Sequence, residues 1–215
     1  MDRFDRNIRF FGTEGQLRAL LQPLADAGTP TRFTTSSRTY LNATLMWAGC
    51  SSDITACHLP PQGNLGRSTF AAKSSYGNRA LTAQGIDVLV RHIEGRRATG
   101  SGSGIVLLDS YGGAINRVPK DATAFVHRDA LFSMQYLAYW DAGAVAAPNV
   151  AWLRRFYAAM RPHVSPFAYQ NYIDADLTNW QHAYYGSNLT RLQRIKRRYD
   201  PQNLFHSRQS IRPSR

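Results

Sequence analysis

Two side chains capable of proton transfer precede a pair of glycines near the middle of this chain. Asp109 and Tyr111 are two positions apart, so in an extended strand both side chains face the same side. Gly112 and Gly113 follow directly, and glycine lets the backbone approach a ligand closely. A carboxylate accepts a proton, and a phenol can pass one on. The pattern therefore predicts a strand that presents proton-transfer groups to a ligand.

A single amide interrupts an apolar and aromatic segment further along the chain. Gln135 lies between Met134 and Tyr136, and we predict that residues 131–140 form a strand. Its amide can orient a hydroxyl group of a substrate. The alternative is a solvent-exposed position without such a role, and the sequence leaves both interpretations open.

The two cysteines, Cys50 and Cys57, lie seven positions apart. A metal site needs three or four ligands, and the adjacent His58 adds only one, so we predict no metal site. A local disulfide and a pair of free thiols both remain open. A disulfide would favour an oxidising compartment.

Composition limits the class of protein. The 215 residues suffice for one full core, or for a core with an appendage. No run of roughly 18 apolar residues occurs, so we expect no membrane span. The net charge is +12, but only three of the 26 basic residues are lysines, and the arginines are scattered along the chain. We therefore expect dispersed charge without nucleic-acid binding. Residues 1–6 lack the apolar stretch of a secretory signal, and the compartment stays open.

Periodicity and turn residues predict interspersed helices and strands. Thr13 is expected to cap a leucine-rich helix that stops at Gly28. The predicted helices cover residues 14–27, 37–47, 82–94, 149–160 and 188–199, and the predicted strands cover 8–11, 70–74, 105–109, 114–118 and 131–140. We expect 105–109 and 114–118 to form a hairpin. This order predicts an α+β fold, with an antiparallel sheet covered by helices and a helical C-terminal tail.

The C-terminal region contains an ordered set of motifs. They are Tyr169-Gln170-Asn171-Tyr172-Ile173-Asp174, Trp180, Tyr184-Tyr185-Gly186-Ser187-Asn188, Arg191-Leu192, Tyr199-Asp200-Pro201-Gln202-Asn203-Leu204-Phe205 and Gln209-Ser210-Ile211. This set resembles the C-terminal signature of the berberine-bridge-enzyme-like flavoprotein oxidoreductases. Four earlier pieces occur in the same order in the substrate domain of that family: Phe10-Phe11-Gly12, Lys73-Ser74-Ser75-Tyr76, Leu108 to Ala114, and His127-Arg128.

The resemblance covers nearly the whole chain and implies a division into two parts. Residues 1–165 would form a substrate-binding α+β domain, and residues 166–215 a berberine-like segment that packs on the flavin side. The glycine-rich pyrophosphate loop of the family's FAD-binding domain cannot be placed in this sequence. We therefore expect most of the FAD site to lie outside this chain, possibly in an N-terminal FAD-binding half.

The resemblance also implies roles for individual residues. Tyr169 and Asn171 fall where the family contacts the flavin, and Tyr172 occupies the position of its catalytic base. The alternatives are turn residues for the first two and a core tyrosine for the third. An unperturbed tyrosine has a pKa of about 10, so Tyr172 needs a partner. Asp109 is the best candidate, as a group that relays or accepts the proton, since a nearby negative charge would raise the tyrosine pKa.

Tyr111 and Gln135 are the predicted substrate-binding residues, and His127 with Arg128 is predicted to be structural. The function implied is the substrate-binding and C-terminal part of an FAD-dependent oxidoreductase. Such an enzyme oxidises an alcohol, a sugar or a natural-product hydroxyl by hydride transfer to flavin. The alternatives are a truncated, non-catalytic binding module without stable FAD binding, and a basic nucleic-acid binder.

Overall fold

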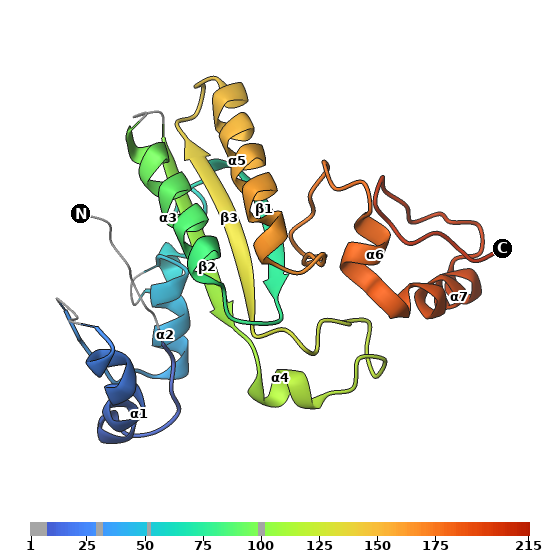
Figure 1. Cartoon of the computed structure of the whole chain (residues 1–215). Coiled ribbons are helices and arrows are strands. Elements are labelled where there is room, and N and C mark those ends of the chain that lie inside the picture. Colours follow the sequence, from blue (N-terminus) through green and yellow to red (C-terminus); the bar gives the residue numbers. More distant parts are fainter. Residues whose placement is uncertain (1–7, 29–31, 51–52, 99–101) are drawn as a thin grey trace. The chain divides into compact units, whose positions relative to one another are not determined.

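The computed structural model of the chain describes residues 8–28, 32–50, 53–98 and 102–215 (Figure 1). The chain forms two compact units, the first within residues 1–67 and the second from Ser68 to Arg215. The functional boundary predicted at residue 165 falls inside the second unit. Within the described residues, no helix has the length and apolar character needed to cross a membrane.

The second unit is built on an antiparallel sheet of three strands. They are β1 (Thr69–Gly77), β2 (Ser103–Ser110) and β3 (Phe132–Trp140), in the order β1-β3-β2, with β3 in the centre. Both pairings are antiparallel. Three of the predicted strands are therefore confirmed, with small shifts at their ends.

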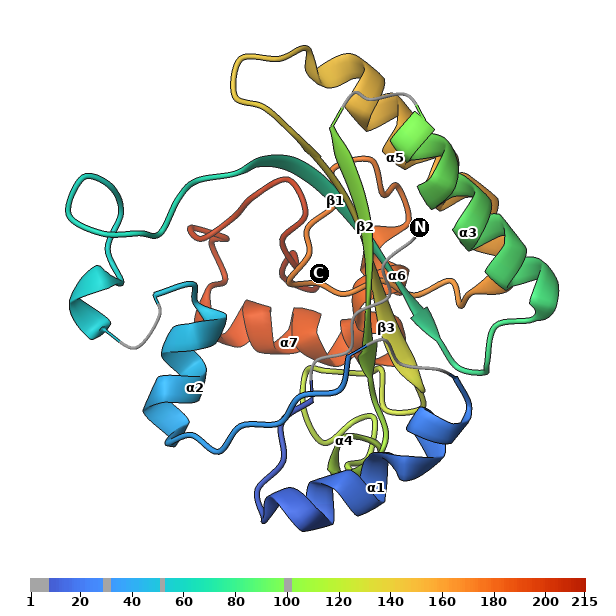
Figure 2. The ribbon, with the colours of Figure 1, turned by 90° about the vertical axis from the view of Figure 1, so that its left-hand side faces the viewer.

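Two helices cover one face of this sheet. In Figure 2, α3 (Ala83–Ala98) and α5 (Ala146–Met160) lie on the same side of the strands. The alternation of β3 supplies the apolar surface for them, since every second side chain of a strand faces the same side. The buried cluster there consists of Met134, Tyr136, Ala138, Trp152, Leu153, Phe156 and Met160. The predicted α+β fold with a helix-covered antiparallel sheet is thus confirmed.

Two helices form the C-terminal part of this unit. They are α6 (Trp180–Tyr185) and α7 (Leu189–Tyr199), which lie beyond the β1 edge of the sheet in Figure 1. The carboxylate of Asp200 ends α7 by accepting hydrogen bonds from the backbone nitrogens of Leu204 at 2.7 Å and Phe205 at 3.0 Å. The helix predicted at 188–199 is confirmed, whereas α6 was not predicted.

The predicted hairpin around Gly112 is wrong. Residues 114–118 do not form a strand, because the chain enters the short helix α4 (Gly113–Arg117). Gly112 has a φ of 113° and Gly113 a φ of 51°, which turn the chain away from the extended direction of β2. The strand β2 therefore pairs with β3 instead of with the residues that follow it.

The first unit contains α1 (Glu14–Asp26), α2 (Tyr40–Trp47) and a short 3-10 helix (Ile54–Ala56). Thr13 caps α1 as predicted: its hydroxyl accepts from the backbone nitrogen of Gln16, whose side chain accepts from the backbone nitrogen of Thr13. The prediction of a strand at 8–11 is wrong, because these residues pair with no strand and remain irregular. The helix α2 begins three residues later than predicted, at the residue that follows its N-cap Thr39.

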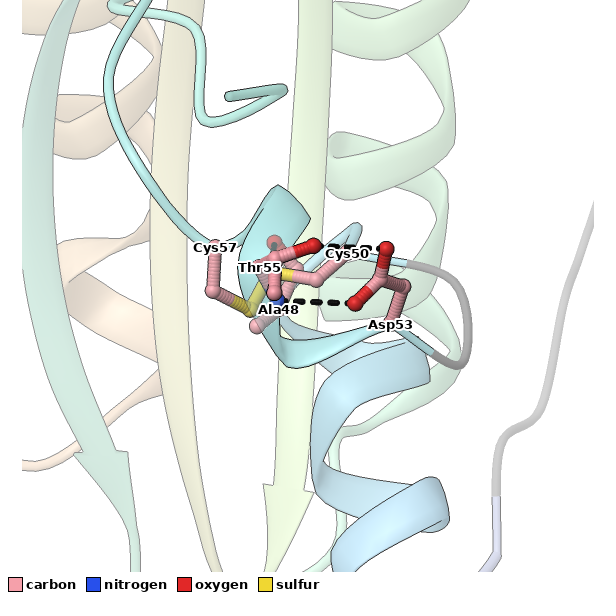
Figure 3. Close-up of a disulfide and its surroundings, with 5 residues drawn as sticks. All are labelled: Ala48, Cys50, Asp53, Thr55 and Cys57. Carbon is pink, nitrogen blue, oxygen red and sulfur yellow. Dashed lines mark hydrogen bonds between the residues drawn. A yellow bond between two sulfur atoms is a disulfide. The ribbon is translucent and has the colours of Figure 1, made fainter. Parts of the chain in front are cut away.

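Cys50 and Cys57 form a disulfide, with Cα atoms 5.2 Å apart (Figure 3). Between them the Asp53 carboxylate accepts hydrogen bonds from the backbone nitrogen of Thr55 at 2.9 Å and from its hydroxyl at 2.7 Å. These bonds cap the 3-10 helix that brings Cys57 back to Cys50. The disulfide, one of two interpretations left open by the sequence, is the correct one.

Candidate functional site

The sheet face opposite α3 and α5 carries a row of polar side chains. Directly paired residues of neighbouring strands face the same side. The register pairs Ser74 with Gln135, Tyr76 with Ser133, and Asp109 with Ser133. The Ser133 hydroxyl donates to the Asp109 carboxylate at 3.3 Å. This surface, which we call the open face, thus collects polar groups from all three strands.

A segment of the C-terminal region attaches to the free edge of β1. The backbone nitrogen of Ser165 donates to the carbonyl oxygen of Tyr76 at 2.8 Å. The backbone nitrogen of Tyr76 donates to the carbonyl oxygen of Phe167 at 3.3 Å. The backbone nitrogen of Tyr169 then donates to the Ser74 hydroxyl at 3.0 Å. Because Ser74 belongs to the open face, this bond directs the following residues toward that face.

Four phenol rings meet at this end of the open face. The ring centroids of Tyr76 and Tyr111 are 5.5 Å apart, those of Tyr76 and Tyr169 are 6.3 Å apart, and those of Tyr169 and Tyr172 are 5.0 Å apart. The rings meet at steep angles, the edge-to-face arrangement that aromatic pairs favour. The fold therefore brings together residues from three separate stretches of the sequence.

Electrostatics keep Tyr172 in its neutral form. Burial is the largest cause that raises its pKa, and the negative charge of Asp109 is the second. The interaction shows that this carboxylate is near enough to act on the phenol. In the part of the chain that the structure describes, no hydrogen bond joins the two side chains. The phenol of Tyr172 is therefore protonated at neutral pH and is not a preformed phenolate.

Three of the predicted site residues have exposed or half-buried amide and phenol groups. The Asn171 amide nitrogen donates to the Tyr169 hydroxyl at 2.8 Å, and Asn171 is exposed. Gln135 is half-buried on the central strand. Its side chain is on the open face and makes no hydrogen bond to another described residue. Both side chains are thus at least partly accessible.

Sequence reasoning assigned no role to Tyr76 or Phe125, which support this cluster. Tyr76 is fully buried and stacks on His127 with ring centroids 4.2 Å apart, and Phe125 packs edge-on against both. The alternation of β1 is a signal that would have placed Tyr76 on the same side as Ser74. Burial raises the pKa of the Tyr76 phenol.

His127 has the structural role that the sequence predicted for it. Its Nε2 lies 3.1 Å from the carbonyl oxygen of Tyr184, and burial lowers its pKa to about 4. A neutral ring that is held by a backbone carbonyl and stacked on Tyr76 is a poor candidate for acid–base catalysis. Among the described residues, no group of three or more His, Cys, Asp and Glu side chains is placed to hold a metal ion.

Comparison with known proteins shows which family this chain resembles. Residues 168–212, which include Tyr169, Asn171 and Tyr172, match the family model described as "Berberine and berberine like". A Bacillus subtilis protein, described as the uncharacterized FAD-linked oxidoreductase YvdP, is 34% identical over 206 residues. That match covers 96% of this chain and 43% of the relative.

Solved structures also match nearly all of this chain over less than half of their own length. BBE-like 1 of Physcomitrella patens superposes with a TM-score of 0.81 at 29% identity, over 95% of this chain and 43% of that one. A chitooligosaccharide oxidase superposes with a TM-score of 0.81 at 26% identity, over 95% of this chain and 45% of that one. The chain thus spans less than half the length of the proteins it matches. Along most of its length this chain is similar to berberine-bridge-enzyme-like FAD-linked oxidoreductases, and the match includes their berberine-like segment.

Proposed function

We propose that this chain is the substrate-binding and C-terminal part of an FAD-dependent oxidoreductase that oxidises an alcohol, a sugar or a natural-product hydroxyl. The observation that carries the proposal is the cluster of the Tyr76, Tyr111, Tyr169 and Tyr172 rings at the end of the open face, where the charge of Asp109 raises the pKa of Tyr172. The similarity to a chitooligosaccharide oxidase supports a sugar hydroxyl as one substrate class. In this proposal residues 166–215 lie on the flavin side.

The donor set on this side fits the ring of a flavin. The polar edge of that ring alternates donors and acceptors, and the exposed Asn171 amide offers both kinds of group. Tyr169, held by Asn171, presents a half-buried ring that can pack against another flat ring. When bound, FAD supplies the acceptor for a hydride from the substrate carbon. We expect most of the FAD site to lie outside this chain.

The residues of the chain itself would then handle the hydroxyl proton. A neutral Tyr172 can take a proton at its oxygen only if its own proton passes to another base. Asp109 is the carboxylate near it, and because Asp109 is exposed it can return the proton to water. Tyr111 and Gln135 would orient the substrate hydroxyl beside this pair. The proposed path runs from substrate to Tyr172, then to Asp109 and solvent.

A complete flavin site, with an FAD-binding half supplied in cis or in trans, allows a direct test. Tyr172→Phe removes the relay oxygen and should slow flavin reduction by about a hundred- to ten-thousand-fold. The flavin spectrum and the amount of bound cofactor should stay unchanged. Tyr199→Phe is the matched control, since Tyr199 is 75% exposed at the end of α7. Flavin reduction by Tyr172→Phe at the wild-type rate would refute the assignment.

Asp109→Asn tests the second half of the path. It should slow flavin reduction less than Tyr172→Phe does, because water can accept the proton at the exposed end of the path. Flavin reduction should still be slower than in the wild type, since the amide of asparagine does not accept the proton. A wild-type rate in Asp109→Asn would show that another group receives the proton.

The second candidate is a binding module that lacks stable FAD binding. Tyr169 and Asn171 can contact only the ring, whereas the pyrophosphate and adenine supply much of the affinity for a dinucleotide. We expect the purified 215-residue chain to bind FAD weakly or not at all. Stoichiometric absorbance near 450 nm after purification would contradict this expectation.

A further inference from the structure

An ion network whose Lys73–Asp174 pair is buried lies on the side of the sheet opposite the phenol cluster. Lys73 of β1 is 4% exposed, and its Nζ donates to both carboxylate oxygens of Asp174, at 2.8 and 2.9 Å. It also donates to Asp176 at 2.9 Å. Arg154 of α5 binds the same Asp176 through two nitrogens, at 2.8 and 2.7 Å. The helix-covered side of the sheet therefore binds the C-terminal segment through charge.

The position of Lys73 next to Ser74 gives this network a geometric consequence. Consecutive residues of a strand face opposite sides, so Lys73 is on the helix-covered side while Ser74 is on the open face. Ser74 accepts from the backbone nitrogen of Tyr169, and Lys73 donates to Asp174. The segment 169–174 thus passes around the edge of the sheet with one anchor on each side of β1. Tyr172 lies between the two anchors.

Other contacts hold the Asp174 end of this segment in place. The backbone nitrogen of Asp174 donates to the Tyr184 hydroxyl at 2.9 Å, and the Gln209 amide donates to the Asp174 carbonyl at 2.8 Å. The Asp174 carboxylate also accepts from the backbone nitrogen of Asp176 at 3.0 Å. Every polar group of Asp174 is therefore paired, and its carboxylate can occupy this site only while Lys73 is opposite it.

We propose that Lys73 is a positioning residue for Tyr172, holding the segment 169–174 around the β1 edge so that the phenol stays beside Asp109. The catalytic role of Tyr172 in this inference rests on the proposed function, but the placement of Tyr172 can be measured without any reaction. The attraction within a buried ion pair is offset by the lost hydration of its two charges, so replacing both partners is often neutral for stability. Removing both charges should therefore preserve folding while releasing the segment.

The test uses the 215-residue chain labelled with 13C at the tyrosine ring carbon that bears oxygen. The double variant Lys73→Met/Asp174→Asn removes the pair without leaving a buried charge. We expect it to fold, with the NMR titration of Tyr172 displaced to lower pH as the phenol leaves the buried position beside Asp109, Tyr111 and Tyr169. The exchange protection of the Tyr169 amide should fall roughly tenfold or more as that end opens.

Matched variants separate positioning from a general loss of structure. Lys120→Met removes a lysine from an ion pair with Asp129 whose two side chains are about half exposed, and it should leave both signals unchanged. Lys73→Arg keeps the charge and should keep the Tyr172 titration near its wild-type position. Ser74→Ala removes the opposite anchor without a charge, and it should displace the Tyr172 titration even if the double variant fails to fold. Wild-type titration and exchange in Ser74→Ala, or in a folded double variant, would overturn the inference.

A kinetic measurement on the enzyme with a complete flavin site distinguishes this inference from the proposed function. Loss of positioning should lower kcat for flavin reduction with a smaller change in KM, because the substrate contacts of Gln135 and Tyr111 remain. Full activity of Tyr172→Phe would refute the catalytic role of Tyr172. The NMR comparison would still decide whether Lys73 places that phenol.

Discussion

The two compact units of this chain are stabilised by different kinds of interaction. In the first unit, across residues 8–28, 32–50 and 53–67, only Leu45 and Cys50 are buried. The second unit has a core between β3 and α5 in which Met134 and Phe156 are fully buried. The first unit therefore relies on a covalent bond and on helix caps, whereas the second relies on apolar burial and paired polar groups. The proposed reaction groups belong to the unit with the core.

Truncation of a core side chain should show the largest difference between the units. Phe156→Ala removes a ring that packs on Tyr136, His92 and Trp152, and it should lower the unfolding free energy of the second unit by about 3 to 5 kcal/mol. Leu20→Ala in α1 is the control, since Leu20 is 62% exposed and its loss should cost less than about 0.5 kcal/mol. Hydrogen exchange measured for each unit during denaturant unfolding gives both changes in unfolding free energy.

Acid should weaken the second unit through His127. Its pKa in the folded chain is about 4, below the ordinary value of 6.5. Between these two pH values the unfolded chain therefore binds a proton that the folded chain does not bind. The stabilisation is complete above pH 6.5 and is lost as the pH falls toward 4, by up to about 3 kcal/mol. His127→Gln, which can still donate to the Tyr184 carbonyl, should remove this slope. An equal slope in the variant would assign the acid sensitivity to other groups.

Loss of the disulfide should affect the first unit selectively. Cys50 and Cys57 close a loop of about eight residues, for which chain entropy predicts a contribution of about 2 to 3 kcal/mol. The variant Cys50→Ser/Cys57→Ser should therefore increase amide exchange around α2 and leave the amides of β3 unchanged. Equal loss of protection in both units would show that the disulfide stabilises the chain as a whole.

The smallest expected effect is at the first helix cap. Thr13→Ala removes the hydroxyl that accepts from the Gln16 backbone nitrogen, and it should cost about 1 kcal/mol within the first unit. Thr13→Ser keeps the oxygen and serves as the control. Exchange rates of the first-turn amides of α1 report the change, and equal rates in the two variants would show that the cap does not hold this turn.

The predictions from sequence succeeded where the cause is local. The cap at Thr13 and the apolar, aromatic strand at 131–140 were predicted, because caps and strand composition act within a few residues. The strand predicted at 8–11 failed because a strand needs a partner, which no local pattern supplies. The strand at 114–118 failed because Gly112 and Gly113 adopt positive φ angles that turn the chain into α4.

The same distinction applies to the candidate site. Asp109, Tyr111, Gln135, Tyr169, Asn171 and Tyr172 could be named from residue pattern and family resemblance, because chemistry and motif order are properties of the sequence. Tyr76 and Lys73 could not be assigned their places, because these depend on contacts across about a hundred residues. The sequence by itself determined which groups are available for proton transfer and the α+β class. Only the tertiary structure decided that β1 carries the segment 169–174 around its edge and brings Tyr172 near Asp109, since strand register and edge pairing arise from long-range packing.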